Sequence, residues 1–391
     1  MDQVTLMNNI AIMTWFHYNN FGTALQAYTL CETIKSFGYH TKIINYHPNC
    51  ENKRSIKELL KDPAVVDRVT NKLRRAFKVY KNPDIERDIR FDEFRRSYIE
   101  LTEKCDTLDK LNSLNGLFDA FVSGSDQVWS PIVFNPRYYL DFVDDRNKLI
   151  AYAPSIGTSK IQSNLVKERM VELILRFKHL SIRENEGQQI IKRLTGKEAK
   201  IVLDPTLLFT KDKYGELLKL NKESAGKEKP YLLCYFLGKN EGNWESAKRI
   251  SKLLNLDICV IPVHNKDYTR DFKIHKGAGP IEFLNYFSQA GFICTDSYHG
   301  TIFSIINQKP FVTYKRFSDK KKYSQNSRIY NILSLLELES QLFQGNDMLS
   351  IESGKKIDYR HVEYLLEEKR KLSIDFLKKA IDECAAISLT R

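Results

Sequence analysis

Short apolar runs alternate with helix-like stripes along most of the chain. Residues 9–16 and 41–46 are predicted to be buried strands, and the apolar positions Ala27, Leu30 and Ile34 between them predict a helix over residues 23–37 that stops at Gly38. The alternation continues with predicted strands at 119–123, 149–154, 179–182 and 199–203, and predicted helices at 165–177 and 184–194. Repeated β-α-β order of this kind predicts a parallel sheet covered by helices.

A second series of the same kind follows a polar stretch at residues 219–229. Its predicted strands are 231–237, 258–263, 292–295 and 310–314, its predicted helices are 244–254, 281–288 and 300–307, and a last helix covers about 362–386. We therefore predict two Rossmann-like α/β domains facing a cleft, residues 1–208 with a helical insert at about 50–112, and residues 209–350. Residues 351–391 hold the C-terminal helix, which is long enough to cross back to the first domain.

The net charge of +12 is unevenly distributed. Residues 53–81 contain ten Lys or Arg and three Asp or Glu, and Val66, Val69, Leu73 and Phe77 recur among them at helical spacing. This pattern predicts a basic amphipathic helix, either with a solvated face or in contact with an anionic membrane surface. Nucleic acid is not expected as a partner, because no binding module is recognisable and the aromatic residues are not interleaved with the basic run.

Composition narrows the class of protein. Hydrophobic residues make up 42% of the chain and charged residues 28%, which is typical of globular proteins, and no apolar run reaches the roughly 18 residues of a spanning helix. The first nine residues are polar, and the apolar run after them is too short for a signal peptide. We expect a cytoplasmic protein, or one peripheral at the inner face of the cell membrane. The seven cysteines are scattered without a CxxC pair, so we expect reduced thiols and no metal site.

Ligands of open α/β sheets bind beyond the carboxyl ends of the strands, so residues directly after predicted strands are candidates for a site. The first such segment is residues 17–22, where Gly22 allows backbone N–H groups to turn toward a ligand. A simple tight turn explains this glycine equally well.

The second segment, residues 123–129, offers groups suited to a carbohydrate. Asp126 and Gln127 can pair with sugar hydroxyls, and Trp129 can stack on the apolar face of a hexose ring. The alternative interpretation is a helix cap at Ser125 or Asp126 beside a half-buried Trp129.

Two further segments carry groups suited to an anion. Arg183 follows a predicted strand, and its guanidinium group matches a carboxylate or phosphate, unless it is a surface residue paired with a neighbouring glutamate. Residues 294–301 place Ser297, His299 and several backbone N–H groups at one predicted helix start, which favours a phosphate. Of the eight histidines, only His299 has such a position.

These segments belong to a characteristic ordered set. Its members are NNFGTALQAY (19–28), VSGSDQVW (122–129), YAPSIG (152–157), SIREN (181–185), LDPTLL (203–208), PIEFL (280–284), TDSYHGT (295–301) and KPF (309–311). The set resembles the polysaccharide pyruvyltransferase family, from about residue 9 to about residue 336. The resemblance implies a fold like that of two-domain, GT-B-like glycosyltransferases, phosphoenolpyruvate as donor, and a cyclic ketal on two hydroxyls of one sugar as product.

The resemblance also assigns residues. The family's histidine before the second-domain helix matches His299, the expected catalytic acid or base, and its first-domain arginine matches Arg183. Some members carry an arginine where this chain has Ser297, so donor binding lacks one cation unless a neighbour supplies it. By position, and not by the resemblance, Lys315 and Arg316 directly after the strand at 310–314 could supply it, and so could Arg328. The expected donor-binding residues are therefore Arg183, Ser297, Gly300, Lys315, Arg316 and Arg328.

Ketal formation requires a bound anion, a diol held close to one carbon, and a general acid or base. The residues expected to hold the sugar are Asn20, Gly22, Gln26, Ser125, Asp126, Gln127 and Trp129. The expected acceptor is a sugar of a surface polysaccharide or of a lipid-linked oligosaccharide, and neither a metal nor a resident cofactor is expected. The alternative function is a metal-independent glycosyltransferase that uses a nucleotide-sugar.

Overall fold

The computed structural model describes residues 8–48, 84–221, 229–318 and 326–389. Within these residues the strands are β1 (Asn9–Met13), β2 (His40–Tyr46), β3 (Leu101–Cys105), β4 (Ala120–Ser123), β5 (Leu149–Ala151), β6 (His179–Ile182), β7 (Lys200–Ile201), β8 (Tyr231–Tyr235), β9 (Asp257–Val260), β10 (Lys273–Ile274), β11 (Phe292–Thr295) and β12 (Phe311–Thr313). They form two parallel sheets, ordered β3-β2-β1-β4-β5-β6-β7 and β10-β9-β8-β11-β12. The predicted pair of Rossmann-like halves is confirmed, and the predicted boundary at residue 208 falls between the sheets.

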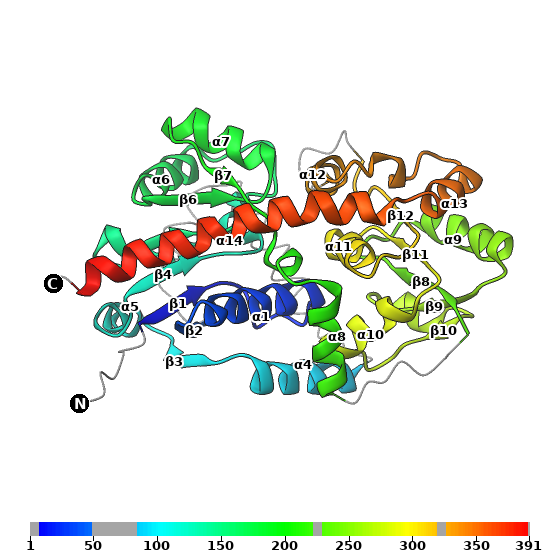
Figure 1. Ribbon diagram of the computed structural model, residues 1–391, viewed down its shortest axis with the longest axis horizontal. Helices are drawn as coiled ribbons and strands as arrows, with labels where there is room; N and C mark the ends of the chain where they lie inside the picture. The colour runs from blue at the N-terminus through cyan, green and yellow to red at the C-terminus, as the bar shows by residue number, and fades with distance from the viewer. Residues whose placement is uncertain (1–7, 49–83, 222–228, 319–325, 390–391) are drawn as a thin grey trace.

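Helices cover the sheets on both faces (Figure 1). They are α1 (Phe21–Ser36), α4 (Ile85–Tyr98), α5 (Leu108–Asn112), α6 (Asn164–Leu175), α7 (Asn185–Thr195), α8 (Lys211–Leu220), α9 (Glu241–Leu254), α10 (Pro280–Gln289), α11 (Tyr298–Ile306), α12 (Ser327–Leu335), α13 (Asp347–Lys355) and α14 (Tyr359–Leu389). No helix of the described chain has both the length and the apolar character needed to cross a membrane.

Several predicted strands extend past their observed ends, for example 149–154 against Leu149–Ala151 and 231–237 against Tyr231–Tyr235. The insert predicted to be helical contains β3, a polar edge strand that pairs with β2. The first strand ends at Met13 rather than residue 16, which leaves Trp15 in a loop. The basic helix predicted around residues 66–78 lies outside the described residues.

The two halves share one hydrophobic core. It contains Ile12, Leu25 and Tyr152 of the first half together with Leu233 and Phe303 of the second. At the junction, the ring of Phe21 on α1 stacks on Phe283 of α10, with centroids 4.5 Å apart and planes 13° apart. Separating the halves would expose this apolar surface to water, which disfavours a wide opening.

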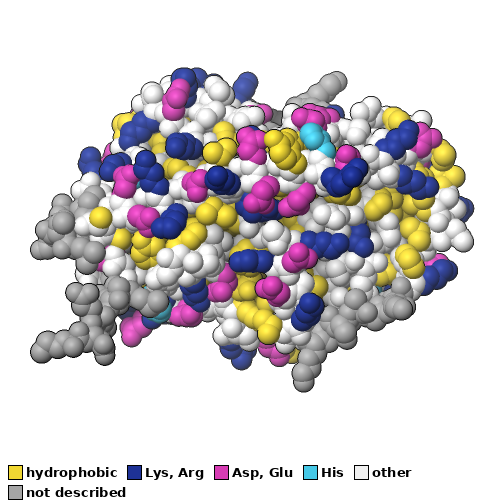
Figure 2. Space-filling view, viewed as in Figure 1, with side chains coloured by type: hydrophobic (Ala, Val, Ile, Leu, Met, Phe, Trp, Pro, Cys, Tyr) yellow, Lys and Arg dark blue, Asp and Glu magenta, His cyan; other side chains and the backbone are white. Residues whose placement is uncertain are grey.

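The long helix α14 runs across both halves (Figure 1). Its Ser373 hydroxyl accepts a hydrogen bond from the Leu203 N–H at 2.9 Å, and Arg370 Nε donates to the Leu207 carbonyl at 3.0 Å. Acidic and basic side chains are mixed over the face seen in Figure 2, and pairs such as Lys378 with Asp382 link successive turns of α14. The hydrogen bonds of Ser373 and Arg370 therefore fix residues 203–207, which lie in the segment that connects the two sheets.

Helix α4 and its cap residue join the first half to the second through hydrogen bonds. Its cap residue Asp84 is buried, and its carboxylate accepts hydrogen bonds from the Gly277 N–H at 2.8 Å and the Tyr268 hydroxyl at 2.9 Å. One turn later, Arg87 Nη1 donates to the Pro262 carbonyl at 2.7 Å. These bonds cross between the halves, so α4 acts as a clasp.

We expect Asp84→Ala to lower the free energy of unfolding by about 2–4 kcal/mol, because it removes a helix cap and leaves the buried Gly277 N–H without its acceptor. Tyr268→Phe removes only one of these bonds and should cost about 1 kcal/mol. Urea denaturation of the two variants measures both values. Equal stability of Asp84→Ala and the wild type would contradict the clasp.

Candidate active site

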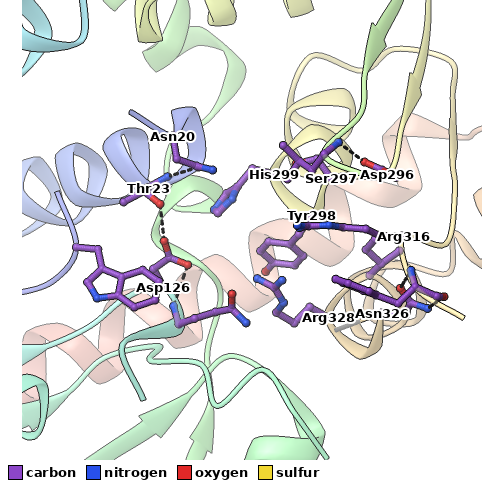
Figure 3. Close-up of a pocket in the computed structure, with 15 residues that line it drawn as sticks. Asn20, Thr23, Asp126, Asp296, Ser297, Tyr298, His299, Arg316, Asn326 and Arg328 are labelled. Atoms are coloured by element: carbon purple, nitrogen blue, oxygen red, sulfur yellow. Dashed lines mark hydrogen bonds between the residues drawn. The ribbon is translucent and has the colours of Figure 1, made fainter. Parts of the chain in front are cut away.

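A pocket lies between the two halves, where the carboxyl ends of strands from both sheets meet. Its cavity volume is about 130 Å³, and it is open to solvent on one side. The first half contributes Trp15, Asn20, Thr23, Asp126 and Gln127, and the second half contributes Leu237, Asp296, Ser297, Tyr298, His299, Arg316, Phe317, Asn326, Arg328 and Ile329 (Figure 3).

Asp126 is the fixed centre of the first-half wall. It follows β4 with a positive φ of 68°, an uncommon backbone conformation outside glycine. Its carboxylate accepts hydrogen bonds from the Thr23 hydroxyl at 2.7 Å and from the Gln127 N–H at 2.8 Å. Asn20 caps α1 by accepting from the Thr23 N–H at 3.1 Å. This wall is therefore polar and rigid, and Trp15 is its aromatic member.

The second-half wall is built on the start of α11. The Ser297 hydroxyl accepts a hydrogen bond from the Gly300 N–H at 3.2 Å. These two residues, both predicted to bind the donor substrate, therefore cap their own helix. Ser297 still lines the pocket, whereas Gly300 does not. Burial raises the pKa of Asp296, although its carboxylate accepts from the N–H groups of Leu237 and Gly238 at 2.6 and 2.9 Å. Asp296 thus braces the loop after β8.

His299 lies where the two walls meet. It is 7% exposed, and Figure 3 shows its imidazole pointing from α11 toward Asn20 and Thr23. A Cβ atom on Gly22 would lie 2.0 Å from Nδ1 of His299, so only a glycine permits this approach of α1 to the ring. Gly22, predicted to contact the sugar, instead makes room for the histidine and does not line the pocket.

Cationic groups gather beside Tyr298. The guanidinium groups of Arg183 and Arg328 lie 4.9 and 5.5 Å from its ring centroid. Burial, together with the charge of Arg183, lowers the pKa of Arg328 to about 10. Arg316 adds a further cation to the same wall. A negatively charged ligand bound here would offset the mutual repulsion of these groups.

Arg183, predicted to bind an anionic donor, does not line the pocket. Its side chain is 1% exposed and forms an ion pair with Asp204, with Asp126 Oδ1 a further 3.5 Å contact. Burial would lower the pKa of Arg183, but Asp204 and its other neighbours raise it above the usual value. The neighbouring Glu184 is also buried and within 3.8 Å. The prediction of a direct ligand contact is corrected to a supporting position behind the wall.

Three residues predicted to hold a sugar are closed off by packing. Trp129 is 0% exposed, stacks on Tyr139 with centroids 4.8 Å apart, and donates to the Ser123 hydroxyl. Gln26 and Ser125 are equally buried, and Gln26 Nε2 bonds to Thr14 and to two backbone carbonyls. The aromatic residue of the first-half wall is instead Trp15, which sequence analysis placed inside a strand.

Of the three cationic residues after β12 that were predicted to bind the donor substrate, two line the pocket and one does not. Arg316 and Arg328 line the pocket, whereas Lys315 is exposed outside it, with Nζ 5.7 Å from the Tyr330 ring. Asn326, which the sequence did not indicate, joins the two segments because its amide bonds to both the N–H and the carbonyl of Phe317. No group of three or more His, Cys, Asp or Glu residues suited to a metal ion occurs in the described part of the chain.

Comparisons with known proteins match this chain to one protein family and to several solved structures. The family model for polysaccharide pyruvyl transferase matches residues 20–316. UDP-GlcNAc 2-epimerase from Neisseria meningitidis bound to UDP-GlcNAc has a TM-score of 0.53 and 9% identity, covering 95% of this chain and 100% of its own, which shows a common fold. The UDP-GlcNAc 2-epimerase from Methanocaldococcus jannaschii has a TM-score of 0.46 at 14% identity, covering 92% and 100%. E. coli heptosyltransferase WaaC with ADP has 0.39 at 10%, covering 92% and 99%. No curated protein matches the sequence significantly.

We expect Gly22→Ala to destabilise the protein by about 1–3 kcal/mol, because the added methyl group would overlap the His299 ring. Gly215→Ala is the matched control, since this glycine also lies in a helix and has nothing within 4 Å of the new methyl group. The control should be neutral or stabilise by up to about 1 kcal/mol. Urea denaturation distinguishes the two; a Gly22→Ala protein as stable as the control would contradict the close approach.

Proposed function

The chain belongs to the polysaccharide pyruvyl transferase family, and on this premise we propose that it transfers a pyruvyl group from phosphoenolpyruvate to a sugar of a cell-surface polysaccharide or its lipid-linked precursor. The observation that carries the proposal is the position of His299 between a cationic wall and a polar wall with an aromatic residue. A proton-transfer group between an anion site and a sugar site is what ketal formation needs.

The cationic wall is the proposed donor site. Arg316 and Arg328 come from different segments of the second half and face the same pocket as Tyr298 (Figure 3). Guanidinium groups suit the carboxylate and phosphate of phosphoenolpyruvate. These two arginines supply the positive charge that Ser297, in place of the arginine of some family members, does not.

The opposite wall is the proposed acceptor site. Trp15 offers a ring for the apolar face of a hexose, and Asn20 and Asp126 offer polar groups for its hydroxyls. The side-chain amide Nε2 of Gln127 is buried and has no hydrogen-bond partner within the described chain. This nitrogen lies against Gly157, where an added Cβ would be 2.1 Å away, so the side chain has to turn before it can donate to a sugar hydroxyl.

The reaction balances with His299 as a proton shuttle. The imidazole takes the proton of the first sugar hydroxyl and delivers a proton to the methylene carbon of phosphoenolpyruvate, which becomes a methyl group, while the hydroxyl oxygen bonds to the central carbon. The second hydroxyl oxygen then bonds to that carbon and phosphate departs with the electrons of the broken C–O bond. The second hydroxyl proton leaves on the phosphate, so no other reactant is required.

We expect the wild-type protein to release phosphate from phosphoenolpyruvate only when a suitable acceptor sugar is present, tested with a panel of simple and lipid-linked galactosides and N-acetylmannosaminides. His299→Gln should lower the rate about 100- to 10,000-fold, because the amide cannot exchange a proton. His40→Gln is the control, since His40 lies on β2 with a side chain 42% exposed and outside the pocket.

The nucleotide-sugar alternative predicts a different result in the same preparation. Thermal stabilisation by phosphoenolpyruvate and not by UDP or GDP supports the proposal. Stabilisation by a nucleotide alone, with no phosphate release across the panel, would replace it with the glycosyltransferase function.

Trp15 should determine acceptor binding. Trp15→Ala is expected to raise the KM for the acceptor about 3- to 10-fold, a stacking contribution of roughly 0.5–1.5 kcal/mol, while the KM for phosphoenolpyruvate changes little. Trp15→Phe keeps a ring and should retain most of the affinity. If Trp15→Ala instead raises only the KM for phosphoenolpyruvate, the donor and acceptor sites have been assigned to the wrong walls.

A further inference from the structure

The carboxylate of Asp204 lies behind the pocket and approaches His299 from the first half. Its side chain is 0% exposed, and Oδ2 is 3.7 Å from Nε2 of His299. The same oxygen pairs with Arg183, while Oδ1 accepts from the N–H and the hydroxyl of Thr206 at 3.0 and 2.7 Å. Asp204 does not line the pocket. It is therefore placed to act on the imidazole and not on a ligand.

The two nitrogens of the His299 ring have different surroundings. Nε2 is buried, its nearest acidic oxygen is Oδ2 of Asp204 at 3.7 Å, and it has no hydrogen-bond partner in the described chain. Nδ1 lies on the edge of the ring that packs against Gly22 of α1, and the ring as a whole lines the pocket. Only Nδ1 is therefore placed to meet a bound substrate.

We propose that Asp204 is a positioning residue that keeps the proton of the neutral imidazole on Nε2, so that Nδ1 of His299 is the nitrogen that exchanges protons with the substrates. The assignment of Nδ1 to proton transfer rests on the proposed function, whereas the tautomer does not. A carboxylate beside one ring nitrogen selects the tautomer with the proton on that nitrogen.

The surroundings of Asp204 keep its carboxylate charged. Burial alone would raise the pKa of Asp204, but His299 and Arg183 beside it hold that pKa well below its usual range. The carboxylate therefore remains an acceptor under ordinary conditions and cannot take up the proton itself. In the proposed reaction, Nδ1 gains the proton of the first sugar hydroxyl and passes a proton to the methylene carbon, and Nε2–H stays in place throughout.

The tautomer can be observed directly in the full-length protein without substrate. Histidine labelled with ¹⁵N reports which ring nitrogen carries the proton, and comparison with His299→Gln identifies the signal of His299. We expect a protonated Nε2 and an unprotonated Nδ1 in the wild type, and a shift toward a mixture of tautomers in Asp204→Asn. The same variant should lower kcat by about 100-fold or more, while the KM for phosphoenolpyruvate changes by a smaller factor.

Asp267→Asn is the matched control. Asp267 is also buried, with a side chain 4% exposed, pairs with Arg270 at 3.4 Å, and accepts from the N–H groups of Val263 and His264. The substitution Asp267→Asn makes the same chemical change outside the pocket. It should alter the stability of the protein but change neither the His299 signal nor kcat.

An Nδ1-protonated tautomer in the wild type overturns the proposal, and so does an unchanged tautomer or a wild-type kcat in Asp204→Asn. If Asp204→Asn does not fold, the tautomer of His299 in the wild-type protein is by itself the test of the proposal. A wild-type protein that never releases phosphate from phosphoenolpyruvate refutes the proposed function, and the substrate-free spectrum still tests the role of Asp204.

Discussion

The guanidinium group of Arg183 has almost no contact with solvent, and a buried charge is stable only if opposite charges and polar groups surround it. Its partners come from distant parts of the chain: Asp126 follows β4, Asp204 follows β7, and the ring of Tyr298 belongs to α11 of the other half. Surrounding this one charge therefore brings two loops of the first half and the start of α11 to the same place. The pocket walls rest on that arrangement.

The same region is held from both sides by contacts that do not involve charge. Phe21 and Phe283 stack across the junction, and one hydrophobic cluster contains residues of both halves. Asn331 of α12 bonds to the carbonyl of Arg183 at 3.3 Å and accepts from the N–H of Asn185, so the second half also grips the segment after β6. The pocket is thus largely formed before any ligand binds.

The fold could be predicted from sequence because each buried strand is a short apolar run. The rule that sites follow strands selected Asp126, His299 and Arg316, and all three line the pocket. What the sequence could not show was burial. Trp129 and Trp15 both follow apolar runs, and only the stacking of Tyr139 in three dimensions decides that Trp129 belongs to the core. Asp204 was overlooked for the same reason, since the partners that give it a role lie far along the chain.

Helix α14 has a consequence for how the protein is made. Val362, Leu366, Leu377 and Ile381 belong to the core that both sheets share, yet α14 is synthesised after every other described element. While the chain is still emerging from the ribosome, the apolar surface that α14 will cover is left to water or to a chaperone. The pocket therefore gains its full support only after α14 has left the ribosome.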